Sequence, residues 1–331
     1  MDKKLIGYIA LFGGIALLPA LGVYPIFVMK VLCYALFACA FNLLVGFTGL
    51  LSFGHAAFLG TAAYVCGHAL KVWGLPTPVG LIAGALAAAG VGLLFGLLAI
   101  RRSGIYFSMI TLALAQMLYF FFLQAPFTGG EDGLQSVPRG SFLGLDLTSD
   151  LTLYYVVLGI FIAAFWLIYR VVHSPFGQVL TSIRENEARA TSLGYDTAHF
   201  KLLAFVLSAG LAGLAGATKT LMLGFATLTD AIWTTSGLVI LMTLVGGMGT
   251  LVGPIVGALV IIALENKIGD FGKLLADTTG VAWFNGLGES VSLVTGLIFI
   301  VCVLAFRRGL VGEAMALWEK RQKPQRPASS S

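Results

Sequence analysis

Charged residues are scarce in this chain. Only 11% of its 331 residues are Asp, Glu, Lys or Arg, whereas 58% are hydrophobic. The mean hydropathy of +0.95 is far above that of a soluble globular domain. The net charge of +5 does not point to nucleic acid, because the basic residues fall in short segments between apolar runs. The composition therefore indicates an integral membrane protein.

Catalytic and metal-binding motifs are also missing. The sequence contains neither a GxxxxGK[ST] phosphate loop nor an HExxH motif. Its four cysteines, Cys33, Cys39, Cys66 and Cys302, lie within apolar runs without CxxC spacing, so we expect them to be small core residues. No Asp or Glu falls in the middle of an expected span, which removes the usual site of a proton or sodium relay. We expect a non-catalytic chain with no metal or cofactor of its own.

Long apolar runs recur along the chain at the length of about 20 residues that a bilayer core requires. Residues 77–100 form such a run without any charge, and similar runs cover 5–21, 24–45, 50–70, 104–124, 151–169, 202–225 and 283–306. Two shorter stretches, 231–245 and 251–264, are marginal in length for a full crossing. Broken, tilted or re-entrant helices are the alternatives to a full crossing there. The pattern predicts an all-α polytopic membrane helix bundle of about ten hydrophobic segments. We expect one transmembrane domain over residues 1–306 and a basic, disordered tail over 307–331.

The distribution of Lys and Arg predicts the orientation, because cytoplasmic loops carry the excess of positive charge. With a cytoplasmic N-terminus and alternating spans, fourteen of the twenty basic residues fall inside and nine of the fifteen acids fall outside. Both termini are then cytoplasmic. The first twenty residues also resemble the start of a signal peptide, but removing them would leave an odd number of crossings. We therefore expect an uncleaved first span.

One polar segment, residues 173–200, interrupts the apolar pattern in the middle of the chain. Its charged residues are expected on a short helix over 183–193 that ends at Gly194, where glycine can take the left-handed conformation. Such a helix between two spans offers a contact to a soluble partner, and a solvated loop is the plain alternative. The candidate partner-contact residues are Arg184, Glu185, Glu187, Ala188, Arg189 and Gly194.

Polar residues inside the spans are candidates for a translocation path, since such side chains face other helices or a cavity. His55 and Ser52 follow a possible non-helical turn, and a histidine bonded to a neighbouring backbone carbonyl is the alternative to a substrate contact. The candidates along the path are Asn42, Thr48, Ser52, His55, Tyr106, Thr111 and Gln116. Lys219, near the outer end of its span, is expected to extend its ammonium to the membrane interface.

Small residues at helical spacing predict close helix packing. Gly249, Gly253 and Gly257 repeat at four residues and are the candidate packing residues of the 231–264 region. Gly210, Gly213 and Gly216 repeat at three residues. Together they indicate a compact bundle.

Several ordered segments resemble the inner-membrane permease subunits of branched-chain amino-acid ABC importers, of the LivM type. They are NLLVGFTGLLSFGHAAFLGTAAY at 42–64, SGIYFSMITLALAQM at 103–117, TGGEDGL at 128–134, LLAFVLSAGLAGLAGA ending at Ala217, and VGGMGTLVGPIVGA at 245–258. In that family, segment 173–200 resembles the EAA coupling loop, which docks on an ATPase subunit. Arg189 stands where a stricter motif would have alanine.

The resemblance implies a set of partners in a bacterial inner (cytoplasmic) membrane. They are a second homologous permease subunit, two cytoplasmic ATPase subunits that bind ATP and Mg²⁺, and a periplasmic or extracellular solute-binding protein resting on 128–150 and 265–289. The implied substrates are branched-chain amino acids, with other amino acids and small amides as open alternatives. A self-contained secondary transporter or facilitator of small polar solutes is the runner-up, disfavoured by the missing mid-span carboxylates. An intramembrane enzyme is weaker still.

The charge distribution predicts which sites an impermeant thiol reagent reaches from outside. Single cysteines at Ser136, Asp270, Ser192 and Ser329, placed in a background without the four native cysteines, should be labelled in intact cells only at positions 136 and 270. External labelling of Ser192→Cys would invert the topology and exclude a cytoplasmic partner at 173–200.

Overall fold

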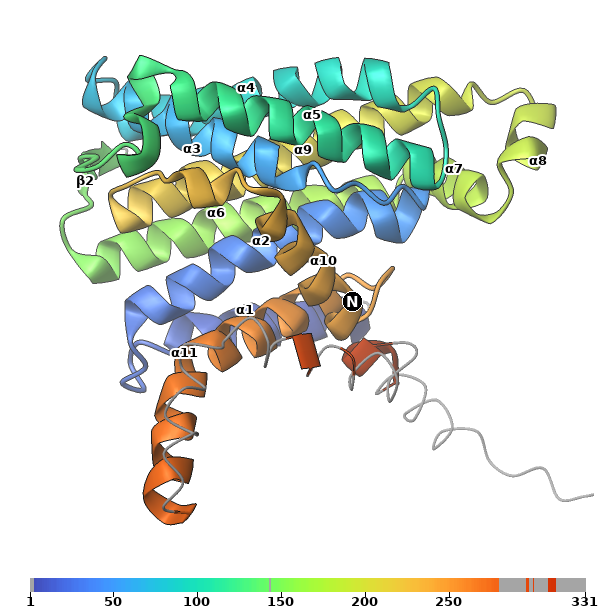
Figure 1. The fold of residues 1–331 in the computed structure, drawn as a ribbon. Helices are drawn as coiled ribbons and strands as arrows, with labels where there is room; N and C mark the ends of the chain where they lie inside the picture. Colours follow the sequence, from blue (N-terminus) through green and yellow to red (C-terminus); the bar gives the residue numbers. More distant parts are fainter. Residues whose placement is uncertain (1–2, 143, 280–295, 298–299, 301–308, 314–331) are drawn as a thin grey trace, which may run out of the picture. The chain divides into compact units, whose positions relative to one another are not determined.

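The protein is described by a computed structural model that covers residues 3–142, 144–279, 296–297, 300 and 309–313 (Figure 1). Its contacts divide the chain into two units, residues 1–240 and 241–331, which we describe separately. The expected tail and the expected run at 283–306 fall almost entirely outside the described residues.

The first unit is a bundle of helices. They are α1 (Lys3–Leu17), α2 (Pro25–Thr48), α3 (His55–Lys71), α4 (Thr77–Ala99), α5 (Ile105–Gln124), α6 (Asp150–Val172), α7 (Pro175–Glu185), α8 (Glu187–Ser192) and α9 (Thr197–Leu223). Three short 3-10 turns, η1 (Pro126–Thr128), η2 (Gly130–Asp132) and η3 (Leu228–Asp230), lie in the connections. The strands β1 (Ser141–Phe142) and β2 (Leu145–Asp146) pair antiparallel.

The helical membrane character expected from the sequence is confirmed. Within the described residues, five helices are long and apolar enough to cross a membrane, namely α2, α4, α5, α6 and α9. Helix α3 starts at His55, five residues into the run that begins at residue 50, because residues 49–54 form a non-helical turn. The count of about ten segments and the cytoplasmic termini stay predictions.

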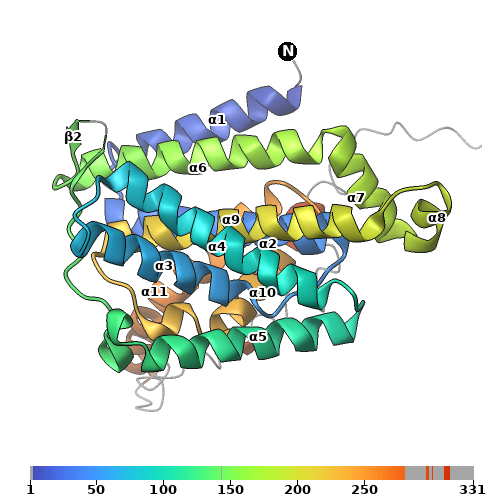
Figure 2. The same ribbon diagram turned by 90° about the horizontal axis from the view of Figure 1, so that it is seen from above.

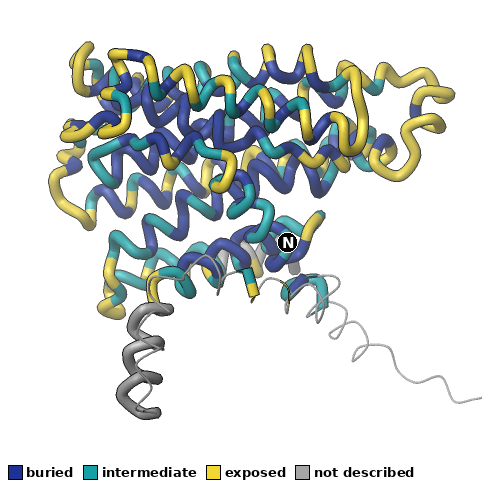
Figure 3. The backbone as a smooth tube through the Cα atoms, in the orientation of Figure 1, coloured by how far each residue is buried: buried dark blue, intermediate teal, exposed yellow. Residues whose placement is uncertain are grey.

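Helix α9 is the centre of the first unit and packs against α2, α3 and α4. Helices α5 and α6 lie on opposite sides of this group (Figure 2). Small residues make the contact close: a Cβ atom added at Gly216 would overlap the backbone of Leu59 on α3, and one at Gly213 would overlap Ala88 on α4. The buried middle of the bundle is dark in Figure 3. The expected close packing at Gly213 and Gly216 therefore occurs in this structure.

The polar segments gather at opposite ends of the bundle. The β1–β2 hairpin lies at one end and α7 and α8 lie at the other (Figures 1 and 2). At the hairpin end, the Lys71 ammonium donates to the Gln135 carbonyl at 2.8 Å, and Arg139 pairs with Asp150 at 2.8 Å. The Thr148 hydroxyl and amide donate to the exposed Asp146 carboxylate, which holds its pKa below the ordinary value. Segments 128–150 and 173–200 therefore lie at opposite ends of the bundle, and the side of the membrane that each faces stays a prediction.

Helices α10 (Trp233–Gly246) and α11 (Gly253–Thr279) occupy the region of the two marginal stretches. Helix α11 continues well beyond residue 264, where the apolar stretch ends. Within the second unit, a Cβ at Gly257 would overlap the Met242 backbone, so α10 and α11 approach closely there. Gly249 does not share this helical spacing, because it lies in the turn between the helices with φ 80°. Only Gly253 and Gly257 of the three candidate packing residues are on a helix.

Packing at Gly216 can be tested against a matched glycine on the same helix. Gly216→Ala should lower the free energy of unfolding by about 1–3 kcal/mol, because the new methyl group meets backbone that cannot rotate away. Gly210→Ala is the control, since its nearest neighbour would be the Ala89 Cβ at an ordinary 3.5 Å. Thermal unfolding in detergent compares the two variants, and equal stability would contradict the packing described here.

Candidate functional site

The segment of residues 173–200, which we call the coupling loop only after the family loop that it resembles, contains α7, α8 and the first turn of α9. The expected single helix over 183–193 is wrong, because the chain breaks at Asn186, which has an extended backbone (φ −158°, ψ 97°). The Asn186 side chain then accepts the amide of Arg189 at 3.0 Å and caps α8. Asparagine is a favoured N-cap residue, so the residue type at 186 indicates a helix start there, whereas hydrophobic periodicity does not.

Gly194 ends α8 as expected. Its φ is +89°, its amide donates to the Thr191 carbonyl at 2.9 Å, and the next amide, of Tyr195, donates to Ala190 at 3.2 Å. These two bonds form a Schellman motif, in which a left-handed residue lets the chain satisfy the last helical carbonyls. Helix α8 therefore ends in a hydrogen-bonded turn of defined geometry.

Glu187 makes an ion pair inside the chain. Its carboxylate accepts from the Lys201 ammonium at 2.5 Å, and the Thr197 hydroxyl lies 3.3 Å from the same oxygen. Lys201 is on α9 and only 6% of its side chain is exposed, whereas Glu187 is about half exposed. The pair joins α8 to α9, so Glu187 is not simply a free surface charge. Sequence reasoning missed the partner because it is fourteen residues away.

Arg184 connects the coupling loop to the end of α2. Its guanidinium donates to the Gly46 carbonyl, and its side-chain carbons lie against Gly49, the residue that follows α2. A cation at a helix C-terminus satisfies a free carbonyl and interacts favourably with the helix dipole. The loop is thus attached to two bundle helices, to α2 through Arg184 and to α9 through Glu187.

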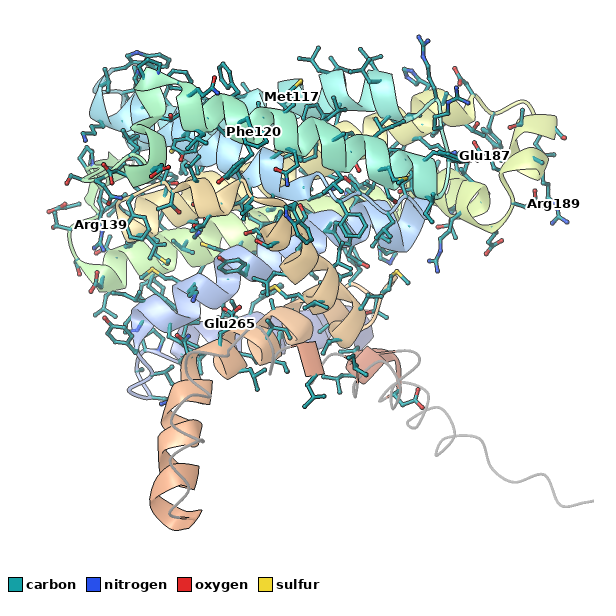
Figure 4. The ribbon with its side chains drawn as sticks, in the orientation of Figure 1. Met117, Phe120, Arg139, Glu187, Arg189 and Glu265 are labelled. Atoms are coloured by element: carbon teal, nitrogen blue, oxygen red, sulfur yellow. The ribbon has the colours of Figure 1, made fainter. Side chains whose placement is uncertain are left out.

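The other candidate coupling residues, Glu185, Ala188 and Arg189, are exposed. In Figure 4, Glu187 and Arg189 lie at the α7–α8 end, far from Arg139. Beside them, a cavity of about 420 Å³ is lined by Pro175, Phe176, Gln178, Val179, Ser182, Tyr195 and Phe200. Its lining includes the stacked rings of Phe176 and Phe200, whose centroids are 5.6 Å apart. The coupling loop therefore presents charged side chains next to an aromatic hollow.

The turn between α2 and α3 is held by hydroxyl groups of α5. The Ser108 hydroxyl donates to the Leu51 carbonyl at 2.6 Å, and the Phe53 amide donates to the Thr111 hydroxyl at 3.2 Å. Ser52 accepts the Gly54 amide at 3.1 Å within the turn. These bonds satisfy the backbone groups that the interrupted helix leaves free. Ser52 and Thr111 are thus structural partners of one turn.

His55 joins three helices from the first residue of α3. Its Nε2 lies 2.8 Å from the Ser208 hydroxyl on α9, and that hydroxyl donates to the Ala40 carbonyl on α2 at 2.5 Å. Because Ser208 has one hydrogen, the bond requires His55 to donate from Nε2. The ring is fully buried beside Phe41 and Phe58, at centroid distances of 5.0 and 5.4 Å. This geometry resembles a core hydrogen bond more than an open substrate contact.

The remaining candidates for the translocation path differ in how far their side chains are exposed. Asn42 and Thr48 are buried on α2, and the Thr48 hydroxyl donates to Leu44 on its own helix. Gln116 is half-buried on α5. Tyr106 is 69% exposed, on the same outward side of the molecule as other large apolar residues of α5, including Met117 and Phe120. The first unit therefore does not enclose Tyr106 with the other candidates.

Lys219 does not extend to an interface. Its side chain is 11% exposed and its ammonium is paired with Asp230, whose side chain is 3% exposed. The expectation for Lys219 is wrong because Asp230, one of the nine acids that the predicted topology places outside, lies on η3 and supplies a buried counter-charge. Asp230 lies on a 3-10 turn and not within a span, so the expectation that no Asp or Glu falls in the middle of a span is not contradicted, although a buried carboxylate does lie against α3.

Comparison with known proteins identifies several relatives. The family described as branched-chain amino acid transport system / permease component matches residues 23–307. The high-affinity branched-chain amino acid transport system permease protein LivM of Escherichia coli (strain K12) is 26% identical over 264 residues, 72% of this chain and 62% of that protein. The ribose import permease protein RbsC of Bacillus subtilis (strain 168) is 29% identical over 213 residues, 59% of this chain and 58% of that protein. The chain thus spans less than two thirds of the length of these relatives.

Among solved structures, PsaBC from Streptococcus pneumoniae in complex with Fab overlaps with a TM-score of 0.41 and 16% identity, over 89% of this chain and 95% of that chain. A score this low does not establish a common fold.

The Glu187–Lys201 pair predicts the effect of a charge reversal in the coupling loop. Glu187→Lys should open the α8–α9 junction, because it places two cations together and leaves the buried Lys201 without its counter-charge. Hydrogen exchange over residues 187–200 should rise by about tenfold or more. The control is Glu185→Lys, an exposed residue for which the structure shows no ion pair, and equal protection in both variants would contradict the assignment.

Proposed function

The chain belongs to the branched-chain amino acid transport system permease family, and we propose that it is the permease subunit of an ATP-driven importer. Family membership rests on the match over residues 23–307, and the apolar helices identify a multi-pass membrane protein. The proposal adds that ATP hydrolysis occurs on separate subunits docked at the coupling loop, in a bacterial inner membrane.

The observation that carries the coupling proposal is the double attachment of the loop. Arg184 bonds to the end of α2, immediately before the turn that leads to His55, and Glu187 bonds to Lys201 near the start of α9. A rigid-body movement of a partner on α7 and α8 would therefore move two core helices. An unattached solvated loop would absorb such a movement.

The surface of the loop suits a protein partner. Exposed Glu185 and Arg189 supply both signs of charge, and the cavity beside Phe176 and Tyr195 can receive an apolar side chain of the partner. By similarity to the importer family, the partners are two ATPase subunits here, a second permease chain in the membrane, and a solute-binding protein at 128–150 and 265–289. Part of that last range lies outside the described residues.

Branched-chain amino acids are the substrates that the relatives favour. Two LivM proteins, from Escherichia coli and Salmonella typhimurium, match this chain over 72% of its length. The ribose permease RbsC also matches, over a shorter length, so the family description alone does not set the solute. We propose that this permease carries amino acids with apolar side chains.

A secondary transporter or facilitator is the second candidate, and the buried Asp230 is the observation that favours it. A single chain of that kind would accumulate solute from a proton or sodium gradient. Asp230 is, however, already neutralised by Lys219, whereas a carboxylate that relays a cation must release and rebind it.

Transport by the assembled complex tests the importer proposal. Proteoliposomes with this chain, its partner permease and the ATPases should take up leucine only with ATP and binding protein. Arg184→Ala should lower uptake by about tenfold or more with ATP hydrolysis retained, because a charge-assisted bond between the loop and α2 is lost.

Arg170→Gln is the matched control, because Arg170 lies in the last turn of α6 and its guanidinium lies over the Trp166 ring of the same helix. Normal uptake by Arg184→Ala would remove this contact from coupling. Accumulation by the single chain in a proton or sodium gradient, without ATPases, would replace the importer by the second candidate.

A further inference from the structure

Asp230 lies beside the middle of α3. The segment after α9 pairs Ala226 with Leu134, whose side chain contacts Gly67, and then brings Ala231 against Gly60. Farther on, the Ser236 hydroxyl accepts the Ala56 amide at 2.9 Å. Residues 226–236 therefore run along α3 from near its C-terminal end to its first turn. Asp230, on η3, is placed between the levels of Gly60 and Gly67.

An ion pair as buried as Lys219 and Asp230 is costly. Removing a carboxylate and an ammonium from water costs several kcal/mol each, and a packed apolar pair of similar volume is often as stable. Ionisable groups inside membrane segments commonly mark substrate or ion pathways. Non-helical backbone at membrane depth is tolerated where it is enclosed by protein or lines a cavity, and in transporters it forms substrate sites. Asp230 combines the two features, because it is a buried ionisable residue and it lies on a 3-10 turn, outside the α-helices, that the protein encloses.

The surroundings add polar groups beyond those that the pair uses. The Tyr64 hydroxyl on α3 and the Thr220 hydroxyl on α9 are buried, and neither has a hydrogen-bond partner among the described residues. Asp230 lies close enough to Tyr64 to act on its hydroxyl electrostatically, and the Thr220 side chain lies toward Gly67 of the same helix α3. The Lys219 ammonium is also 5.7 Å from the ring centroid of Tyr34. The pair is therefore part of a polar cluster with hydrogen-bonding capacity left over.

We propose that Lys219 and Asp230 form a binding site for the zwitterionic head of an amino acid, Lys219 for its carboxylate and Asp230 for its ammonium. The inference rests on the proposed transport function and names the feature of the substrate that this chain itself recognises. In the structure the two residues neutralise each other. On binding, the Lys219–Asp230 contact is replaced by two ion pairs with the ligand.

The charges of the site select the ligand class. A simple cation would satisfy Asp230 but oppose Lys219, and an anion would do the reverse. A neutral solute would leave both charges without a better partner than each other. An α-amino acid carries its ammonium and carboxylate on one carbon, so it can replace both members of the pair at once. The Tyr64 hydroxyl, which has no other partner among the described residues, is available to the ligand carboxylate or ammonium.

The decisive variant removes the pair without leaving a lone charge. Lys219→Met with Asp230→Leu should keep the fold, because a buried ion pair can be replaced by apolar residues of similar volume. If the pair only fastens η3 to α9, this double variant should transport normally. If the pair binds the zwitterion, kcat/KM for leucine uptake by the assembled transporter should fall by at least about 30-fold.

The matched control alters two buried hydroxyls on the same helices. Thr61 and Thr218 each donate only to a carbonyl four residues earlier on their own helix, at 2.6 and 2.7 Å. Thr61→Val with Thr218→Val should therefore leave uptake within about twofold of wild type. A loss in this control equal to that of the charge-free variant would show that α3 and α9 tolerate no buried change, and would overturn the specific role of the pair.

A binding measurement separates this inference from the transport proposal. The thermal unfolding midpoint of the purified permease complex should rise with millimolar leucine, valine or alanine. Leucinamide, which lacks the carboxylate, and 4-methylpentanoate, which lacks the ammonium, should not raise it at the same concentration. In the Lys219→Met/Asp230→Leu variant, no amino acid should raise it.

Equal stabilisation of wild type and variant, or no stabilisation of wild type by any of the three amino acids, would overturn the inference. Stabilisation of wild type alone, together with absent ATP-dependent uptake, would instead overturn the importer and keep the site.

Discussion

The close backbone approach of α3 and α9 is the constraint on which the rest of the first unit depends. Gly216 lets the α9 backbone lie against the Leu59 backbone without an intervening side chain, and Gly213 leaves room on α9 for the Ala88 methyl group of α4. Helices that touch in this way cannot slide freely, because any shift brings a side chain into the space that glycine leaves open. The same helix carries Lys201, Ser208 and Lys219, which bond to the coupling loop, to His55 and to Asp230. Helix α9 therefore fixes the positions of the coupling loop, of His55 and of Asp230 relative to one another.

The arrangement of these bonds explains how a movement at the coupling loop can reach the core. Arg184 and Glu187 attach the loop to helices that contact each other directly, so a partner on the loop acts on a joined pair rather than on one flexible strand of chain. The turn at residues 49–54 lies next to this attachment and is held to α5 by Ser108 and Thr111. Side chains of α5 thus stabilise the break between α2 and α3, and they have this structural role whether or not a solute passes near them.

Hydropathy was sufficient to locate most of the helices, because a bilayer span leaves a long apolar run in the sequence. It could not locate the break at Asn186 or the continuation of α11 beyond residue 264, since both depend on local backbone preferences in polar segments. The prediction for Gly194 is confirmed, because one residue type is strongly preferred in the left-handed position.

Ion-pair partners that lie far apart along the chain could not be predicted from residue spacing. Glu187 is fourteen residues from Lys201, and Asp230 reaches Lys219 only because residues 226–236 turn back along α3. Spacing and charge alone therefore place Lys219 at an interface and Asp230 in an outer loop, where isolated charges are expected. The roles of the candidate coupling and path residues stay predictions.

The position of the Lys219–Asp230 pair also bears on what kind of device it can be. A gate requires its two members to lie on parts that separate when the protein changes state. Lys219 is on α9, and Asp230 is on a segment fastened to α3 by the Ser236–Ala56 bond and by Ala231 against Gly60. Since α3 and α9 are in backbone contact at Gly216, both members belong to one packed unit. A rigid-body movement of that unit leaves the pair intact, whereas a ligand can open it by side-chain rotation alone. The packing of the bundle thus favours recognition over gating at this pair.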